Sequence, residues 1–198
     1  MVESRTGYVL TCNQNSPRTQ FSKNVLEKVG FNVILFDCIP HENKVLSNKI
    51  SMMAIYQIIA DGNDEWGYVF EDDINILQDI NLNEIIEYEK ISSKFFYLGA
   101  CIPYQANREL NCNKIDNHEV SIISGNVRGL HAIGISKEGA KDLLSFCKDF
   151  TNWEYMDMIL EKFSEKNPAN IIRYNLESYI HGHRGIFFQD RDRFPSTI

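Results

Sequence analysis

Three consecutive carboxylates, Glu71, Asp72 and Asp73, are the residues of this sequence that most clearly indicate chemistry. They directly follow an apolar run, residues 66–70, whose aromatic and β-branched content is typical of a buried strand. Adjacent carboxylates repel one another, and a buried charge without a partner is strongly disfavoured. Hard divalent cations prefer oxygen ligands of this kind and often retain a substrate phosphate. The triplet therefore indicates either a metal–diphosphate site or a charged strand end followed by a turn.

A second carboxylate stands out in the segment 152–165, whose apolar residues recur at helical spacing. Asp157 falls within the apolar stripe of this expected helix, whereas Glu154 shares a side with Glu161 and Glu165. An inward carboxylate near a helix start is either satisfied by backbone donors or poised for proton transfer.

Two histidines, His181 and His183, flank a glycine in the expected loop 179–185, and Arg184 follows them. Imidazoles in this arrangement could ligate a metal or hydrogen-bond a phosphate, but they are equally compatible with a solvated turn.

The composition narrows the class of protein. The 198 residues suit one domain, residues 1–198, and 43% of them are hydrophobic, enough for a substantial core. No apolar run is long enough to span a membrane, and the N-terminus lacks a signal-peptide layout, so we expect a cytoplasmic protein. The net charge is −7 without a basic block, which argues against nucleic-acid binding. The cysteines are odd in number and never form a C-x-x-C pair, which favours reduced thiols over disulfides or a zinc site.

Strand-like and helix-like segments alternate along the chain, which predicts β-α-β units and a parallel sheet covered by helices. The expected strands are 7–12, 32–36, 66–70, 94–98, 120–123, 129–135 and 171–174, and the expected helices are 17–29, 47–60, 82–88, 137–150 and 152–165. Ligands of open α/β sheets gather at the carboxyl ends of the strands, where both the triplet and the loop 13–16 should lie. The aperiodic stretch 99–118 is expected to be an active-site loop or a mobile segment.

Taken together, these stretches resemble glycosyltransferase family 25, which includes bacterial lipopolysaccharide glycosyltransferases and collagen galactosyltransferases. The closest similarity is at residues 66–73, where the family reads Trp-x-x-x-Leu-Glu-Asp-Asp. Residues 16–18 resemble its Ser-Pro-x-Arg element, residues 132–140 its Ala-Tyr-x-x-Ser-x-x-Gly-Ala block, and Gln189 with 196–198 its C-terminal Gln…Ser-x-Ile. Met52 stands where the family has a histidine.

The resemblance implies a GT-A fold, with a twisted, mostly parallel sheet that is flanked by helices and binds a nucleotide sugar at its strand ends. It also implies a UDP-sugar donor, Mn²⁺ (or Mg²⁺) at the acidic motif, and inverting transfer of galactose or glucose to a glycan or a glycosylated protein or lipid.

On this hypothesis Asp73 is the main metal ligand, Glu71 ligates or orients, and His183 or His181 supplies a third ligand. Asp157 is the expected general base, with Glu154 in reserve. The expected donor-binding residues are Thr11, Cys12, Asn13, Arg18, Asp72 and Arg184.

Two other classes remain open from the sequence. A catalytically inactive nucleotide-sugar-fold protein could serve as a binding subunit, and the departure at Met52 is compatible with that role. An unrelated Mg²⁺-dependent phosphohydrolase fits the acidic residues, but the sequence offers no motif for its nucleophile.

Overall fold

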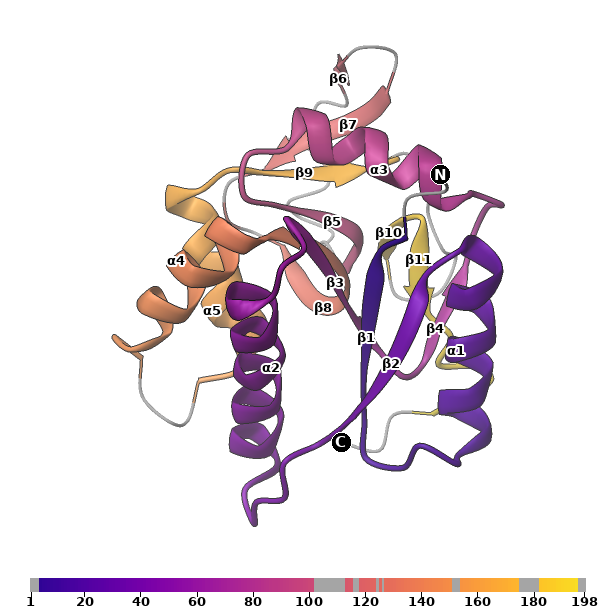
Figure 1. The fold of residues 1–198 in the computed structure, drawn as a ribbon, viewed down its shortest axis with the longest axis vertical. Coiled ribbons are helices and arrows are strands. Elements are labelled where there is room, and N and C mark those ends of the chain that lie inside the picture. Colours follow the sequence, from indigo (N-terminus) through magenta and orange to yellow (C-terminus); the bar gives the residue numbers. More distant parts are fainter. Residues whose placement is uncertain are drawn as a thin grey trace.

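A mixed sheet runs through the centre of the protein, and helices cover both of its faces (Figure 1). The structure is a computed structural model that describes residues 4–101, 113–115, 118–123, 125, 127–150, 154–174 and 182–195. The strands are β1 (Thr6–Thr11), β2 (Asn32–Asp37), β3 (Trp66–Glu71), β4 (Ile74–Ile76), β5 (Phe95–Cys101), β6 (Asn113–Ile115), β7 (His118–Ile123), β8 (Arg128–Ser136), β9 (Ala169–Ile172), β10 (His183–Gly185) and β11 (Phe187–Gln189). The helices are α1 (Pro17–Val29), α2 (Lys44–Asp61), α3 (Leu82–Ile91), α4 (Lys137–Cys147) and α5 (Met156–Lys166).

The strand order of the central sheet is β2-β1-β3-β8-β5-β9-β7-β6, and β10 pairs with β5. The β1 strand runs parallel to both β2 and β3, as the alternation of strands and helices predicts, and β5 runs parallel to β9. The β8 strand is antiparallel to its neighbours β3 and β5, so those two strands share one direction, as do β1, β2 and β9. The expected α/β class with a mostly parallel, helix-flanked sheet is therefore confirmed.

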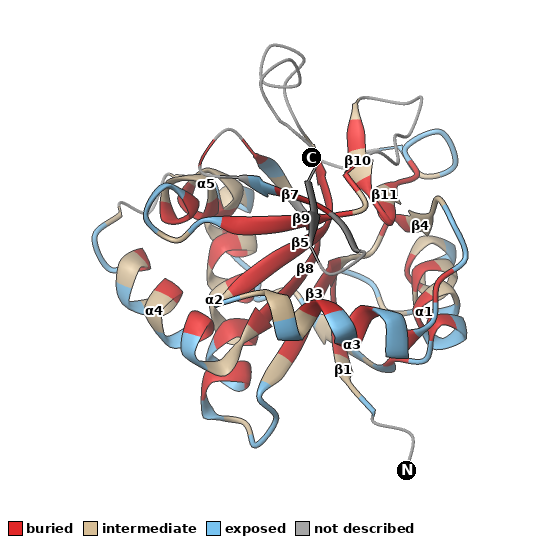
Figure 2. Ribbon diagram, turned by 90° about the horizontal axis from the view of Figure 1, so that it is seen from above, coloured by how far each residue is buried: buried red, intermediate tan, exposed pale blue. Residues whose placement is uncertain are grey.

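Each face of the sheet has its own hydrophobic core. Helices α2, α4 and α5 cover one face through residues such as Ile55, Leu143 and Leu160. Helices α1 and α3 cover the other, together with a small sheet of β4 and β11 that contributes Phe187. Figure 2 shows buried residues along the central strands and exposed residues on the outer sides of the helices.

The local signals of α1 place it next to the acidic triplet. The Ser16 side chain accepts a hydrogen bond from the Thr19 N–H, Pro17 occupies the first turn, and Gly30 ends the helix with a φ of 115°. A short loop, residues 12–16, joins the carboxyl end of β1 to the N-terminus of α1.

Three features of the structure differ from the expectations or go beyond them. Helix α5 begins at Met156, because Tyr155 precedes it as an extended N-cap residue, and the expected start at 152–153 lies outside the described residues. The segment 183–185 is a strand rather than a loop, because it pairs with the end of β5. The strands β7 and β8 do not pair with each other, since β8 inserts between β3 and β5.

Among the described helices, none is both long and apolar enough to cross a bilayer.

Candidate functional site

The acidic triplet lies at the carboxyl end of β3, as expected from the sequence. Glu71 is the last residue of β3 and pairs with Leu10, so the end of β1 lies beside it. Asp73 is only 2% exposed, and its Oδ1 atom is buried without a hydrogen-bond partner among the described residues. An unsatisfied buried acceptor costs about 1–3 kcal/mol, and more when it is charged. The fold thus holds a carboxylate with an unsatisfied acceptor atom at the carboxyl ends of the strands, where ligands of α/β sheets bind.

Arg18, in the first turn of α1, bridges two members of the triplet. Its Nε atom lies 2.6 Å from Asp72 Oδ1, and one terminal nitrogen lies 3.2 Å from Asp73 Oδ2. Burial raises the pKa of Asp73, and the guanidinium of Arg18 opposes this shift. Arg18 therefore neutralises part of the negative charge of the three consecutive carboxylates.

Asp72 is occupied by contacts within the protein. Its Oδ2 atom accepts hydrogen bonds from Thr11 at 2.9 Å and from Thr19 at 3.3 Å. Because these donors lie at the end of β1 and the start of α1, Asp72 fixes the loop between them. Its expected contact with the donor ribose or sugar stays a prediction.

Glu71 is held partly in its protonated form. Burial raises the pKa of Glu71 to about 8, and the charges of Asp73 and Asp72 add to the shift. Its Oε2 atom accepts a hydrogen bond from Gln189 at 2.5 Å, and Arg191 in turn donates to Gln189 at 3.0 Å. The last residue of β11, itself held by Arg191, therefore orients Glu71 from the opposite end of the chain.

These residues fit a divalent metal ion. The oxygens of Glu71 and Asp73 are hard donors that suit Mg²⁺ or Mn²⁺. The unpartnered Oδ1 atom of Asp73 and the raised pKa of Glu71 both indicate that a cation would relieve the site.

Asp157 lies in the first turn of α5 and is half-buried. Its Oδ1 atom accepts the Met158 N–H at 2.8 Å, and its charge contributes to the raised pKa of Glu71. The charge of Asp157 is thus felt at Glu71, and its expected role as general base stays a prediction. Glu154 instead forms an ion pair with Lys162 at 2.9 Å.

Two tyrosines that sequence reasoning did not single out lie near these carboxylates. The hydroxyls of Tyr56 and Tyr97 are fully buried and have no partner among the described residues. Burial raises the pKa of both phenols, and the charges of Glu71 and Asp157, respectively, are among the further causes. Two unpartnered hydroxyls beside the acidic site are compatible with a polar ligand there.

The remaining predicted donor-binding residues fall into two groups, with Thr11, Cys12 and Asn13 at the end of β1 beside the triplet and Arg184 on β10. Thr11 is buried, whereas Cys12 and Asn13 are exposed in the loop after β1. Arg184 lies on β10, where its guanidinium stacks 5.5 Å from the ring centre of Tyr174. His181 lies outside the described residues.

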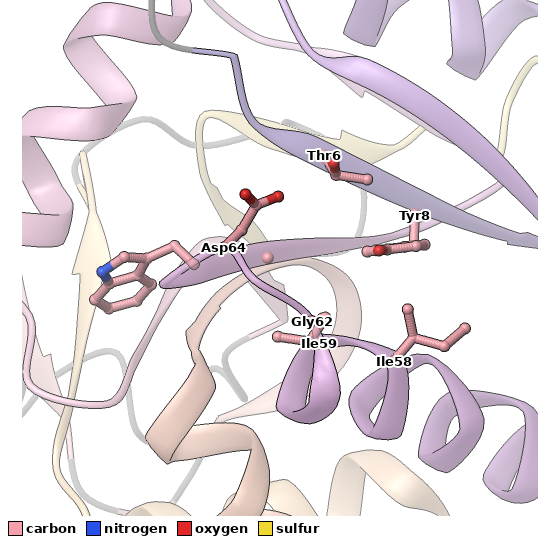
Figure 3. Close-up of a pocket in the computed structure, with 8 residues that line it drawn as sticks. Thr6, Tyr8, Ile58, Ile59, Gly62 and Asp64 are labelled. Carbon is pink, nitrogen blue, oxygen red and sulfur yellow. The ribbon is translucent and has the colours of Figure 1, made fainter.

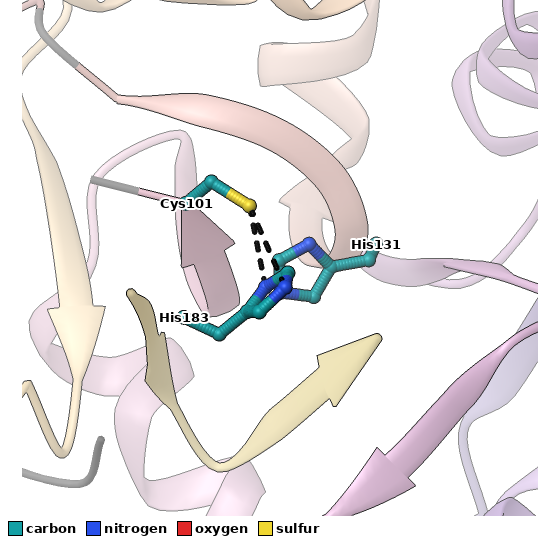
Figure 4. A group of neighbouring side chains, drawn as sticks. All are labelled: Cys101, His131 and His183. Carbon is teal, nitrogen blue, oxygen red and sulfur yellow. Dashed lines mark hydrogen bonds between the residues drawn. The ribbon is translucent and has the colours of Figure 1, made fainter. Parts of the chain in front are cut away.

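His183 is fully buried on β10 and contacts Cys101 and His131 (Figure 4). Its Nδ1 atom lies 3.2 Å from Cys101 Sγ, and its ring centre lies 5.0 Å from that of His131. The prediction that His183 ligates a metal ion held by the triplet stays untested. Neither Cys101 nor His131 is distinguished in the sequence, because each lies alone within an apolar strand.

A small pocket of about 30 Å³ lies elsewhere (Figure 3). Its lining includes Thr6 and Trp66, the first residues of β1 and β3, so it lies at the strand ends opposite the triplet. Its volume corresponds to about one water molecule, which excludes it as a substrate site.

Comparison with known proteins supports the fold. No protein-family model matches the sequence, and no curated protein matches it. The structure is similar to that of a UDP-glucose pyrophosphorylase complexed with UDP-glucose, with a TM-score of 0.52 and 8% identity over 94% of this chain and 93% of that one. This likeness shows that the two proteins share a fold.

Two further structures are more distant. One is a glycosyltransferase involved in the glycosylation of the major capsid of PBCV-1, with a TM-score of 0.48 and 10% identity over 82% of this chain and 76% of that one. The other is an apo UDP-glucose pyrophosphorylase, with a TM-score of 0.47 and 9% identity over 94% and 76% of the two chains.

Proposed function

We propose that this protein is a cytoplasmic, metal-dependent glycosyltransferase. It would move a hexose, galactose or glucose, from a UDP-sugar to a hydroxyl of a glycan or of a glycosylated protein or lipid, with inversion. The observation that carries the proposal is the buried, unpartnered Oδ1 atom of Asp73 beside Glu71, at the carboxyl end of β3. The nucleotide-sugar-binding fold supports it.

The first requirement of sugar transfer is a stabilised leaving group. A Mn²⁺ or Mg²⁺ ion held by Glu71 and Asp73 would act as a Lewis acid on the departing diphosphate. Gln189 keeps Glu71 oriented through its hydrogen bond. Arg18 exchanges its contact with Asp73 for a phosphate oxygen of the donor, because its guanidinium suits bidentate phosphate binding.

The second requirement is a general base for the acceptor hydroxyl. We choose Asp157 for two reasons. The Met158 N–H fixes its Oδ1 atom by a hydrogen bond, and the negative charge of Asp157 contributes to the raised pKa of Glu71. The Oδ2 atom then accepts the acceptor proton during a single displacement, which inverts the sugar carbon. A positioned base of this kind contributes roughly 10²–10⁴-fold to the rate.

One observation favours an alternative function. Arg18 already pairs with both Asp72 and Asp73, so a guanidinium partly neutralises the charge that a metal ion would meet. In a catalytically inactive nucleotide-sugar-binding protein, this ion pair would persist when the sugar nucleotide binds.

The deciding experiment incubates the protein with a panel of UDP-sugars and Mn²⁺ and measures UDP release, with and without glycan acceptors. We expect UDP release from one donor, increased by an acceptor and abolished by EDTA. Binding of a UDP-sugar without release would instead identify the inactive protein. Release of inorganic phosphate would identify the phosphohydrolase.

A further inference from the structure

The side chains of Cys101, His131 and His183 form a compact cluster that the proposed function does not use (Figure 4). They come from three strands: Cys101 ends β5, His183 begins β10, and His131 lies within β8. Each offers one ligand atom, and these atoms all lie within 4.8 Å of one another. Cys101 Sγ lies 3.2 Å from His183 Nδ1.

His131 is the unexplained member of this cluster. The side chain is 0% exposed, yet neither ring nitrogen has a hydrogen-bond partner among the described residues. Burial lowers the pKa of His131 well below its usual value, and His183 and Arg191 add to the shift, although the Phe187 backbone opposes it. The ring is therefore neutral and carries a lone pair that is suited to ligation.

The backbone around the cluster holds the His131 ring in place. A Cβ atom at Gly99 would lie 2.8 Å from two ring atoms, and one at Gly129 would lie 3.0 Å from Nδ1. The pairing of β5 with β8 is also irregular on both sides of Gly99, before it resumes at Cys101 and Arg128. Such bulges re-aim side chains, and here Cys101 and His131 converge.

We propose that Cys101, His131 and His183 bind Zn²⁺ at a site beside the acidic triplet, so that His183 serves this site instead of the metal ion expected at the triplet. Zinc bonds of about 2.3 Å to sulfur and about 2.0–2.1 Å to nitrogen, in tetrahedral geometry, separate sulfur from nitrogen by about 3.5 Å. The ligand atoms, which all lie within 4.8 Å of one another, need only small side-chain shifts to reach this geometry. Thiolate and imidazole select zinc over Mn²⁺ or Mg²⁺.

Through these three ligands the zinc ion would link the start of β10 to the end of β5 and to β8. Three protein ligands leave a fourth position for water or another oxygen ligand. The strand β11 follows β10 and ends at Gln189, which donates to Glu71. The zinc site would therefore have a structural role, because it would position β10 and β11 and with them Gln189, which orients Glu71.

A nucleophilic role for Cys101 fits the structure less well. Burial raises the pKa of the Cys101 thiol to about 12, and the charge of Glu71 adds to this shift. Reactive cysteines have lowered pKa values in electropositive, partly exposed surroundings.

The test measures zinc in the full-length protein, purified after growth with added zinc and passed over a chelating resin. We expect about one zinc per chain by mass spectrometry of the metal content. Cys101→Ser and His183→Asn should each retain at least tenfold less zinc. The matched controls Cys38→Ser and His41→Asn, at a half-buried cysteine and an exposed histidine, should retain it.

A spectroscopic measurement keeps the test decisive if a variant fails to fold. Co²⁺ added to the metal-stripped wild-type protein should produce a thiolate-to-cobalt charge-transfer band, which zinc then displaces. A folded wild-type protein without zinc and without this band would overturn the proposal. Equal zinc in folded Cys101→Ser, or loss of zinc in Asp73→Asn, would also overturn it. None of these measurements depends on glycosyl transfer, so the two proposals fail separately.

Discussion

The carboxyl edge of the sheet carries two clusters of ionisable side chains. The two clusters differ in how the free-energy cost of burying such groups is compensated. The acidic triplet is contiguous in sequence and consists of hard oxygen donors. The thiol–imidazole cluster, Cys101 with His131 and His183, is assembled from three strands and consists of softer donors. The two are close enough for the charge of Glu71 to raise the pKa of Cys101.

The two clusters differ because their side chains carry different charges when no metal ion is bound. A carboxylate is ionised at neutral pH, so the triplet needs Arg18, the donors around Asp72, and a proton on Glu71. A thiol and a neutral imidazole carry no charge, so His131 and His183 can be fully buried without counterions. The triplet is therefore suited to an ion that arrives with a charged substrate, and the second cluster to an ion that stays.

The largest effect should come from Asp73→Asn. The substitution changes the carboxylate whose Oδ1 atom is buried without a partner among the residues that the structure describes. Mn²⁺-dependent UDP release should fall by about a thousandfold, the upper end for loss of a preorganised electrostatic group. The control is Asp79→Asn, at an exposed position, which should behave as wild type. Near-normal turnover in Asp73→Asn would remove the triplet from the chemistry.

Asp157→Asn separates proton transfer from metal binding. We expect turnover to fall by about a hundredfold while the affinities for Mn²⁺ and UDP-sugar stay within about twofold, because a general base acts on the acceptor only. Asp149→Asn, at an exposed residue after α4, is the matched control. Loss of donor affinity together with melting temperature would show that Asp157 is structural. A larger loss of turnover in Glu154→Gln would transfer the role of base to Glu154.

Gln189→Ala tests the connection between the C-terminal strands and the triplet. Without the hydrogen bond to Oε2, Glu71 is less well oriented, and the Kd for Mn²⁺ should rise by about tenfold, a usual cost of removing a partner that orients a metal ligand. Isothermal titration calorimetry measures this change. Gln57→Ala, at an exposed residue of α2, should leave the Kd unchanged.

The last effect concerns the stability of the metal-free protein and not its turnover. Folding raises the pKa of Glu71 from 4.5 to about 8, chiefly through burial. Between these values the folded chain keeps a proton that the unfolded chain releases, so stability is greatest below about pH 4.5, falls as the pH rises through this window and levels off above pH 8.

Urea unfolding in EDTA at pH 5, 6.5 and 8 measures this dependence. Glu71→Gln should flatten it, because the amide resembles the protonated acid, whereas the exposed control Glu42→Gln should keep the wild-type slope. An unchanged slope in Glu71→Gln would mean that Glu71 is ionised in the folded protein.

Much of the fold could be predicted from local patterns. The Ser16–Pro17 start and the Gly30 end of α1 each have a physical signal within a few residues. The strand before the triplet was equally evident from its composition, and its carboxyl end is where the acidic residues lie. The start of α5 was misplaced, because apolar spacing alone does not say where a helix begins, and Tyr155 makes no side-chain cap.

The site was only partly predictable. Glu71, Asp72 and Asp73 were identifiable because they are adjacent. The ion pairs of Arg18 with Asp72 and Asp73 were not expected, and the expected roles of Arg18 and Asp157 stay predictions. Cys101 and His131 carried no signal, since single cysteines and histidines in apolar strands usually belong to the core. The absence of C-x-x-C spacing argued against zinc, but that rule applies to ligands supplied by local loops.

The sequence by itself determined the class of fold and the position of the acidic triplet, because both depend on neighbours along the chain. Tertiary structure alone decided that β8 inserts between β3 and β5 and that β10 pairs with the end of β5. These pairings join residues from distant parts of the chain, and no local propensity encodes them. They are the reason that Cys101, His131 and His183 meet beside the carboxylates.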